Sequence, residues 1–199
     1  MNLFRLSICP RRRRSPLLAL ALLACLPACF QLREPEPATV ASEWITPTQI
    51  DILLVNFTAA IEKLNAANYE RSFSGPDYRF IPDPSSAGTV PALFANWSVT
   101  EESNYVNSLR RRTPFGTVNQ LALSDRRDNL YTADSVEVSA TYALRIMQTD
   151  TAFRAKLLQG IITLKVRRRN NEGRIAAWRD QRTSASPCWT DLKIYFITH

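Results

Sequence analysis

The fold is decided by residues 136–147, which read Val-Glu-Val-Ser-Ala-Thr-Tyr-Ala-Leu-Arg-Ile-Met. Apolar side chains recur at every second position from Val136 to Ile146, and mostly polar side chains lie between them. This period of two predicts a long β-strand with one buried face. Residues 152–169 predict its neighbour in the sheet. The apolar positions of this second strand change from odd to even numbers near Gln159-Gly160, which indicates a β-bulge that bends the sheet.

The segments on either side extend this sheet. Residues 170–173 read Asn-Asn-Glu-Gly and predict a hairpin turn. We expect further strands at 174–181 and, as the last element of the chain, at 189–197. Upstream, residues 117–124 predict a strand that ends in a polar turn at 125–129. The whole C-terminal part of the chain therefore predicts one antiparallel sheet.

Helices are expected before the sheet. Thr46-Pro47 is a helix-start signal, and apolar residues at helical spacing from Ile50 to Leu64 predict one amphipathic helix over residues 47–68. Residues 69–73 extend this helix or start a second, short one.

A second long helix is predicted over about residues 90–112. Acidic residues near its start and Arg110–Arg112 at its end complement the helix dipole. Between the two helices, residues 77–82 predict a short strand and residues 83–91 a Pro/Ser/Gly loop. The predicted fold class is α+β, with N-terminal helices packed in the concavity of a long, curved antiparallel sheet.

The first 28 residues are typical of a secretory signal peptide. Arg11–Arg14 form a basic region, and an apolar stretch of Leu and Ala follows it. The uncharged stretch from Pro16 to Phe30 covers 15 residues, whereas a bilayer-spanning helix needs roughly 20. Leu22-Leu23-Ala24-Cys25 and Leu26-Pro27-Ala28-Cys29 both resemble the lipobox of bacterial lipoproteins, in which the cysteine after the cut is acylated.

We favour Cys29 as the lipid anchor, with Cys25 as the other choice and an ordinary secretory signal as the alternative. The expected organisation is a signal peptide at 1–28, a tether at 29–42 and a folded domain at 43–199. The protein would then be held on a bacterial membrane by palmitate-type acyl chains, in the cell envelope, and would face the periplasm or the exterior.

The charge and the reactive residues exclude several classes of function. Of the 25 basic residues, five precede residue 28, and the rest of the chain has 20 basic against 18 acidic residues. The basic pI therefore gives little reason to expect a nucleic-acid partner. The single histidine, His199, argues against a histidine-based triad or metal site, and we expect neither a metal nor a cofactor. Cys188 is the one cysteine beyond residue 29, so a disulfide framework is not expected.

Several segments resemble the nuclear transport factor 2-like superfamily, which includes the ketosteroid isomerases and the SnoaL-type polyketide cyclases. They are Tyr69 to Phe73, Asp77-Tyr78-Arg79-Phe80-Ile81-Pro82-Asp83, Trp97 before a Glu-bearing helix, Arg174-Ile175-Ala176-Ala177-Trp178-Arg179-Asp180 and Cys188-Trp189-Thr190-Asp191-Leu192-Lys193. The resemblance implies a cone-shaped, cystatin-like fold with a pocket at its wide end. Some members are enzymes on small hydrophobic molecules, while others bind a ligand or form homodimers through the open sheet face.

Two sets of residues are candidates for a site of this kind. An isomerase-type site needs a carboxylate in an apolar pocket with a facing donor, and Asp83 or Asp180 with Tyr142 would supply them. The plainer interpretation is that Asp83 caps a turn and that Asp180 pairs with a cross-strand arginine. The residues that would line a pocket for a small hydrophobic ligand, or else form the core, are Tyr69, Tyr78, Phe80, Trp97, Tyr105, Tyr142 and Trp178.

The favoured function is a non-catalytic domain that binds a small ligand or another protein; the alternative is an enzyme of the isomerase or cyclase type. A ligand-binding domain predicts a roomy apolar cavity, and an enzyme predicts a buried aspartate with a raised pKa. A protein-interaction domain predicts a filled interior and an exposed sheet face that carries Ser139, Thr141, Ala143 and Met147. Arg167–Arg169 are either a solvated strand end or a contact for anionic lipid headgroups.

Overall fold

A five-stranded sheet with the strand order β1-β5-β4-β3-β2 is the scaffold of the domain. The structure is a computed structural model and describes residues 43–199, so the predicted signal peptide, the tether, Cys25 and Cys29 lie outside the described residues. The strands are β1 (Arg79–Ile81), β2 (Gln120–Thr132), β3 (Ser135–Arg145), β4 (Leu157–Arg169) and β5 (Glu172–Gln181). The four long strands are antiparallel, as predicted, and short β1 joins β5 in parallel.

Two details of the sheet differ from the prediction. The polar stretch 125–129 does not form a turn; it lies within β2, where the register against β3 shifts between Ser124 and Arg127. The predicted bulge at Gln159–Gly160 is also wrong, because the register shift of β4 lies at Lys165–Val166. The apolar positions change from odd to even numbers because β4 begins only at Leu157. The apolar residues before it belong to a loop.

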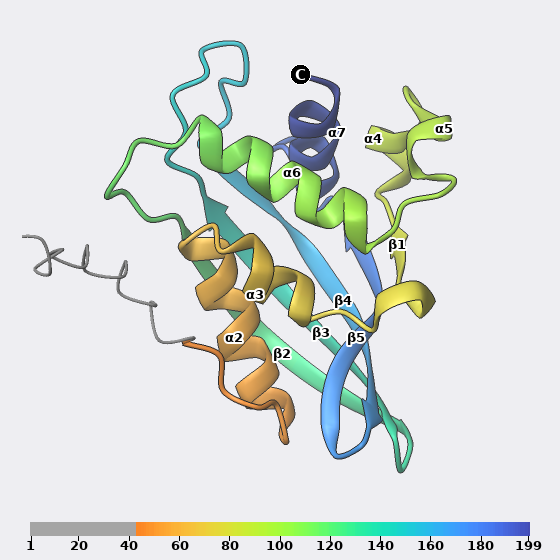
Figure 1. The fold of residues 1–199 in the computed structure, drawn as a ribbon. Helices are drawn as coiled ribbons and strands as arrows, with labels where there is room; N and C mark the ends of the chain where they lie inside the picture. The colour runs from red at the N-terminus through yellow and green to blue at the C-terminus, as the bar shows by residue number, and fades with distance from the viewer. Residues whose placement is uncertain (1–42) are drawn as a thin grey trace, which may run out of the picture. The chain divides into compact units, whose positions relative to one another are not determined.

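The helices cover one face of the sheet (Figure 1). The predicted helix over 47–68 is interrupted at Leu64, where φ is +51°, and Asn65 caps a second helix. The predicted helix over 90–112 is also two helices, since Ser98 and Glu101 form a capping box that starts the second one. The helices before the sheet are α2 (Ile50–Glu62), α3 (Ala66–Arg71), α4 (Pro84–Ala87), α5 (Pro91–Phe94) and α6 (Val99–Arg111), with a 3₁₀ turn at Gly75–Asp77.

The last element is a helix, α7 (Trp189–Thr198), so the strand predicted over 189–197 is wrong. Cys188 is its N-cap, and the Asp191 side chain accepts a hydrogen bond from the Cys188 backbone N–H at 2.7 Å. Trp189, Leu192 and Phe196 recur at helical spacing and are buried. α7 therefore lies beside α6 and brings its buried face onto the sheet (Figure 1).

The core fills the space between the helices and the sheet. Its sheet side is formed by alternate residues of the long strands, among them Val138, Tyr142, Leu164 and Trp178. Within residues 43–199, no helix is both long enough and apolar enough to cross a bilayer.

Candidate functional site

An ion pair between Glu102 of α6 and Lys193 of α7 lies at the centre of the interior. The two side chains are fully buried, and Lys193 Nζ lies 2.5 Å from Glu102 Oε1. Glu102 points into the interior because it lies on the same face of α6 as the buried Tyr105 and Leu109. Lys193 lies next to the buried Leu192 on α7. A charge without a partner would be very costly at this depth, so the two groups depend on each other.

Three neutral donors complete the surroundings of the Glu102 carboxylate. The Tyr78 hydroxyl donates to Oε1 at 2.5 Å, the Trp97 indole N–H donates to Oε1 at 2.8 Å, and the Tyr69 hydroxyl donates to Oε2 at 2.9 Å. With Lys193, the carboxylate accepts hydrogen bonds from four groups of its own chain. Burial, followed by the Glu102 charge, raises the pKa of Tyr69 and of Tyr78 well above the ordinary value.

The Lys193 ammonium group is enclosed by aromatic rings. Its Nζ lies 3.4 Å from the centroid of the Phe80 ring and 3.6 Å from that of the Trp178 ring, which is cation–π geometry. Burial lowers the pKa of Lys193 to about 8, although the facing Glu102 charge acts in the opposite direction. The indole N–H of Trp178 is buried and has no acceptor.

A chain of hydrogen bonds continues from this pair towards the sheet. The hydroxyl groups of Tyr69 and Tyr105 are 2.9 Å apart, and the Trp189 indole N–H donates to the Tyr105 hydroxyl at 3.1 Å. The Trp189 backbone N–H donates to the Tyr142 hydroxyl at 2.7 Å, which in turn donates to Asp180. These contacts link α3, α6, α7 and β3, so they fix the helices against the sheet.

Asp180 is buried on β5, but it has no arginine partner, so that part of the prediction is wrong. Its cross-strand neighbour is Ile162. The carboxylate accepts a hydrogen bond from the Tyr142 hydroxyl at 2.8 Å and two from Thr190, through its backbone N–H and its hydroxyl, both at 2.6 Å. Because Thr190 lies in the first turn of α7, Asp180 satisfies donors at the start of that helix. Burial and the Asp180 charge raise the pKa of Tyr142.

Asp83 caps α4, as the plainer interpretation predicted. Its side chain accepts hydrogen bonds from the backbone N–H groups of Ser85, Ser86 and Arg182 at 2.9–3.1 Å. Burial raises the pKa of Asp83, but the hydrogen bonds from Ser85, Arg182 and Ser86 outweigh it and bring the pKa below the ordinary value. A carboxylate held ionised in this way is a poor general acid.

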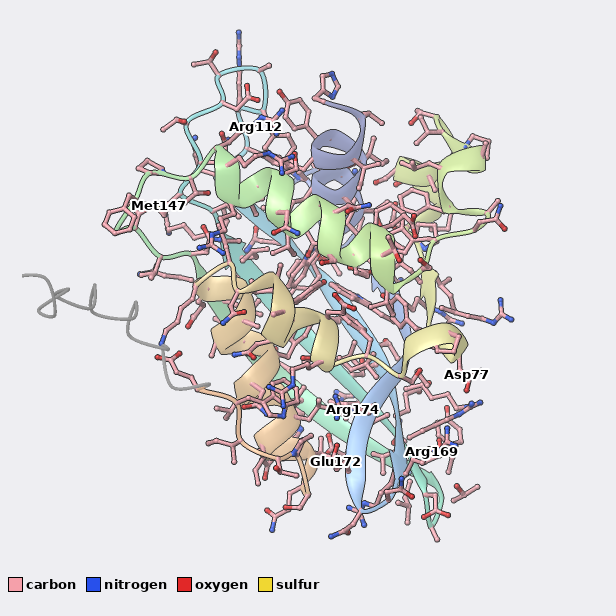
Figure 2. All side chains as sticks on the ribbon, viewed as in Figure 1. Asp77, Arg112, Met147, Arg169, Glu172 and Arg174 are labelled. Carbon is pink, nitrogen blue, oxygen red and sulfur yellow. The ribbon has the colours of Figure 1, made fainter. Side chains whose placement is uncertain are left out.

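The seven candidate pocket residues are all buried in the interior, where Tyr142 is linked to the others through Trp189. Their exposed fractions range from 0% for Tyr69, Tyr105, Tyr142 and Trp178 to 6% for Phe80. The Phe80 ring packs on Trp97 and Trp178 with centroids 5.8 and 5.4 Å apart. The hollows of about 830 Å³ between α6 and α7 and of about 440 Å³ between α2 and β2 lie outside this group. Figure 2 shows how densely side chains occupy the space between the helices and the sheet.

The pairing of Glu102 with Lys193 is not predicted from the sequence. The sequence predicts a strand at Lys193, and at Glu102 it predicts only an acidic residue that complements the helix dipole. The available signal was spacing, since Glu102 lies three residues before Tyr105 and seven before Leu109 on one helical face. Cys188 is buried, and burial raises its pKa to about 12, so it is not a reactive thiol. No group of histidine, cysteine and acidic residues within 43–199 is arranged to hold a metal ion.

Comparison with known proteins gives matches in structure alone. No protein-family profile and no curated protein sequence matches the chain. Among solved structures, a Novosphingobium aromaticivorans protein provisionally named an aromatic ring hydroxylase matches with a TM-score of 0.56 and 13% identity, over 72% of this chain and 93% of that one. A second protein of the same organism, provisionally named a scytalone dehydratase, matches with a TM-score of 0.54 and 10% identity, over 70% of this chain and 89% of that one.

A third solved structure names the fold. It is a nuclear transport factor 2-like superfamily protein of Salmonella enterica serovar Typhimurium, with a TM-score of 0.51 and 12% identity, over 68% of this chain and 87% of that one. The described domain therefore has the nuclear transport factor 2-like fold, as predicted. At these identities the likeness shows the fold alone.

Proposed function

We propose that this chain is a membrane-anchored lipoprotein of the cell envelope whose domain is non-catalytic and acts by binding another protein. The observation that carries the proposal is the closed interior. Glu102 accepts hydrogen bonds from four groups of its own chain, and Lys193 is enclosed by Glu102 and two aromatic rings. Both charged groups are thus satisfied within the chain, which supports a role in stabilising the fold.

The outer face of the sheet supports the same proposal. Opposite the helices, Thr141 and Ala143 of β3 lie beside Ser124 and Ala122 of β2, and beside Ile161 of β4. This central area is uncharged and made mostly of small side chains, which suits close packing against another sheet. We propose that the partner is a second copy of this chain, because a face of small side chains can pair with itself about a two-fold axis. Met147, which was grouped with this face, lies beyond the end of β3.

The lipid anchor is tested by labelling. Cells that produce the full chain are fed an alkyne-bearing fatty acid, and the chain is compared with Cys29→Ser and Cys25→Ser variants. Incorporation that Cys29→Ser abolishes and Cys25→Ser preserves is the expected result. A chain that is never labelled, or that loses its leader without acylation, contradicts the anchor.

The closed interior is tested by extraction. The full chain, purified gently from membranes, is unfolded in organic solvent, and the released small molecules are measured by mass spectrometry. We expect no organic molecule in stoichiometric amount apart from membrane lipid. A stoichiometric small molecule would contradict the proposal.

A small-ligand domain is the second candidate, and one observation favours it. The Trp178 indole N–H lacks an acceptor beside Lys193, so the interior retains one donor that a ligand could use if the helices opened. A ligand held in this way would be lost from a Trp178→Phe variant and retained by a Trp44→Phe variant, since Trp44 lies outside the buried core.

A further inference from the structure

The two hairpins of the sheet end side by side. Ser135 at the start of β3 pairs with Arg167 near the end of β4, so the β2–β3 and β4–β5 turns lie at the same end of the domain (Figure 1). We call residues 126–137 and 165–174 the hairpin end. Figure 2 shows Arg169, Glu172 and Arg174 in this part of the molecule, with Arg112 at the opposite end.

The hairpin end is basic. It contains seven basic and four acidic residues. Arg126 pairs with Asp128 and Asp51, and Arg174 pairs with Glu172. Among the described residues, no carboxylate is within ion-pair distance of the three guanidinium groups of Arg167–Arg169, and all three residues are exposed. Asp128 and Glu172 are thus engaged by other arginines, and Asp134 and Glu137 form no ion pair with Arg167–Arg169, so this run keeps its charge for a partner.

The three arginines surround the end of the sheet. Val166 points into the core, so the alternation of the strand places Arg168 on the helix side and Arg167 and Arg169 on the outer side. A small partner on one face would meet only some of these groups. A flat anionic surface that approaches the strand ends would meet all three.

Exposed apolar side chains lie among these charges. Leu130 is 75% exposed and Tyr131 is 58% exposed, on opposite sides of β2 just before its turn. A hollow of about 120 Å³ beside Leu130 is lined by Ile50, Val166 and Arg168. Basic, aromatic and aliphatic side chains in one exposed region are typical of protein surfaces that sit at the headgroup level of a bilayer.

The hairpin end lies within reach of the membrane that would hold the proposed lipid anchor, and this step rests on that proposal. Glu43 is fourteen residues after Cys29, and a fully extended chain of fourteen residue steps spans at most about 50 Å. Glu43 pairs with Lys63 just after α2, and the chain then follows α2 back to Pro47, whose carbonyl accepts a hydrogen bond from Gly173 N–H at 2.8 Å. The 13-residue α2 is about 20 Å long, which is shorter than this reach.

From this arrangement we infer that the hairpin end is a docking surface for a bilayer rich in anionic lipid headgroups. Arg167–Arg169 bind the lipid phosphates, while Leu130 and Tyr131 enter the headgroup layer. In this orientation the strand ends contact the membrane and the sheet is roughly perpendicular to the bilayer. The outer sheet face is then accessible to a second copy of the chain.

The test uses the full chain isolated from membranes and reconstituted in vesicles. An environment-sensitive dye is attached to an Ala133→Cys variant, in the exposed β2–β3 turn, and Cys188 does not react because it is buried. We expect a blue shift of the dye in vesicles that contain phosphatidylglycerol, and none in vesicles of phosphatidylcholine alone. Replacing Arg167, Arg168 and Arg169 together by Gln should weaken this contact about 100-fold, since each basic residue at an anionic surface contributes roughly fivefold.

Two controls make the outcome specific. The same dye on a Phe115→Cys variant lies beyond the far end of β2, roughly 40 Å away, and should not shift. A Leu130→Ser, Tyr131→Ser variant keeps the charge and should lower the blue shift while retaining its dependence on phosphatidylglycerol. No shift at residue 133, or a shift that the three glutamine substitutions leave unchanged, overturns the docking surface.

Failure of the anchor would be seen separately. Flotation of the labelled chain with phosphatidylcholine vesicles reports the anchor, because these vesicles offer no anionic lipid. A chain that does not float with them contradicts the proposed anchor. The dye experiment is then repeated with Cys9, Cys25 and Cys29 replaced by Ser, so that the signal still comes from residue 133 and decides the docking surface.

Discussion

Lys193 Nζ lies 2.5 Å from Glu102 Oε1, and neither residue is exposed to solvent. The pair joins α6 to α7 across the centre of the domain. A buried ion pair is seldom a source of net stability, but the loss of one partner leaves an isolated charge. Here Glu102 also accepts three neutral hydrogen bonds, whereas the hydrogen-bond partner of Lys193 is Glu102 alone among the described residues, and aromatic rings cover the rest of its ammonium group. The two partners are therefore unequal.

This inequality predicts different costs for the two single substitutions. Glu102→Gln leaves the lysine without a counter-charge, and Lys193→Met leaves a carboxylate that keeps its neutral donors Tyr69, Tyr78 and Trp97. We expect each to lower the free energy of unfolding by about 3–5 kcal/mol, with Glu102→Gln at the upper end. Urea unfolding measures both. The double variant should cost less than the sum, and strictly additive costs would show that the residues do not act as a pair.

The same pair predicts a dependence of stability on pH. Burial lowers the pKa of Lys193 to about 8, from 10.5. Between these values the unfolded chain holds a proton on Lys193 that the folded chain has lost, so the lysine makes the free energy of unfolding rise with pH. The Asp180 charge, like that of Glu102, opposes this lowering of the Lys193 pKa, and the hydroxyls of Tyr69, Tyr78 and Tyr105 face the Glu102 charge.

The measurement is a difference. Cys188, with a pKa raised to about 12, and the buried tyrosines make stability fall at high pH, but they are present in wild type and in Lys193→Met, so their shared contribution cancels in the difference. Subtracting the free energy of unfolding of Lys193→Met from that of wild type isolates the lysine. This difference should increase between pH 8 and 10.5, and a constant or decreasing difference would refute the lowered pKa.

The sequence predicts most of the fold because apolar and polar residues alternate along the strands of the sheet. Val136 to Ile146 alternate without interruption, and β3 forms there. The fold class and the four long strands follow from such patterns, since burial of one face fixes which side chains of each strand point into the core. Leader and tether predictions concern residues that the structure does not describe.

The interior was harder to predict because it depends on α7. Residues 189–197 are rich in β-branched and aromatic side chains, which favour a strand by propensity, while the cap at Cys188 and the spacing of Trp189, Leu192 and Phe196 favour a helix. The helix forms because it buries Trp189, Leu192 and Phe196 in the core. Once α7 is read as a strand, Lys193 cannot be placed beside Glu102, and the central pair is lost from the prediction.

Gly160 predicts a steric effect. A Cβ at this position would lie 2.5 Å from the backbone oxygen of Gln181 and 2.8 Å from the Tyr142 hydroxyl. Gly160→Ala should lower the free energy of unfolding by about 1–3 kcal/mol, because neither neighbour can move without disturbing the sheet or the Asp180 hydrogen bond. Gly173→Ala is the matched control, with its closest neighbour at 3.4 Å. It should change stability by less than about 1 kcal/mol in thermal or urea unfolding, and equal effects of the two substitutions would contradict the close packing.

The proposed pairing of two copies predicts the effect of a charge on the outer sheet face. Thr141 is exposed near the centre of that face, on the strand that pairs with β2 and β4. Thr141→Arg places two like charges close together about the two-fold axis, so self-association should weaken at least about tenfold while the monomer keeps its fold. Cross-linking of the chain in its own membranes, followed by size analysis, measures the dimer.

Asn104→Arg is the control: it adds the same charge at an exposed site on α6 and should leave the dimer intact. A dimer that survives Thr141→Arg but not Asn104→Arg would move the interface from the sheet to the helices, and a wild-type chain that never cross-links to itself would remove the second copy as the partner.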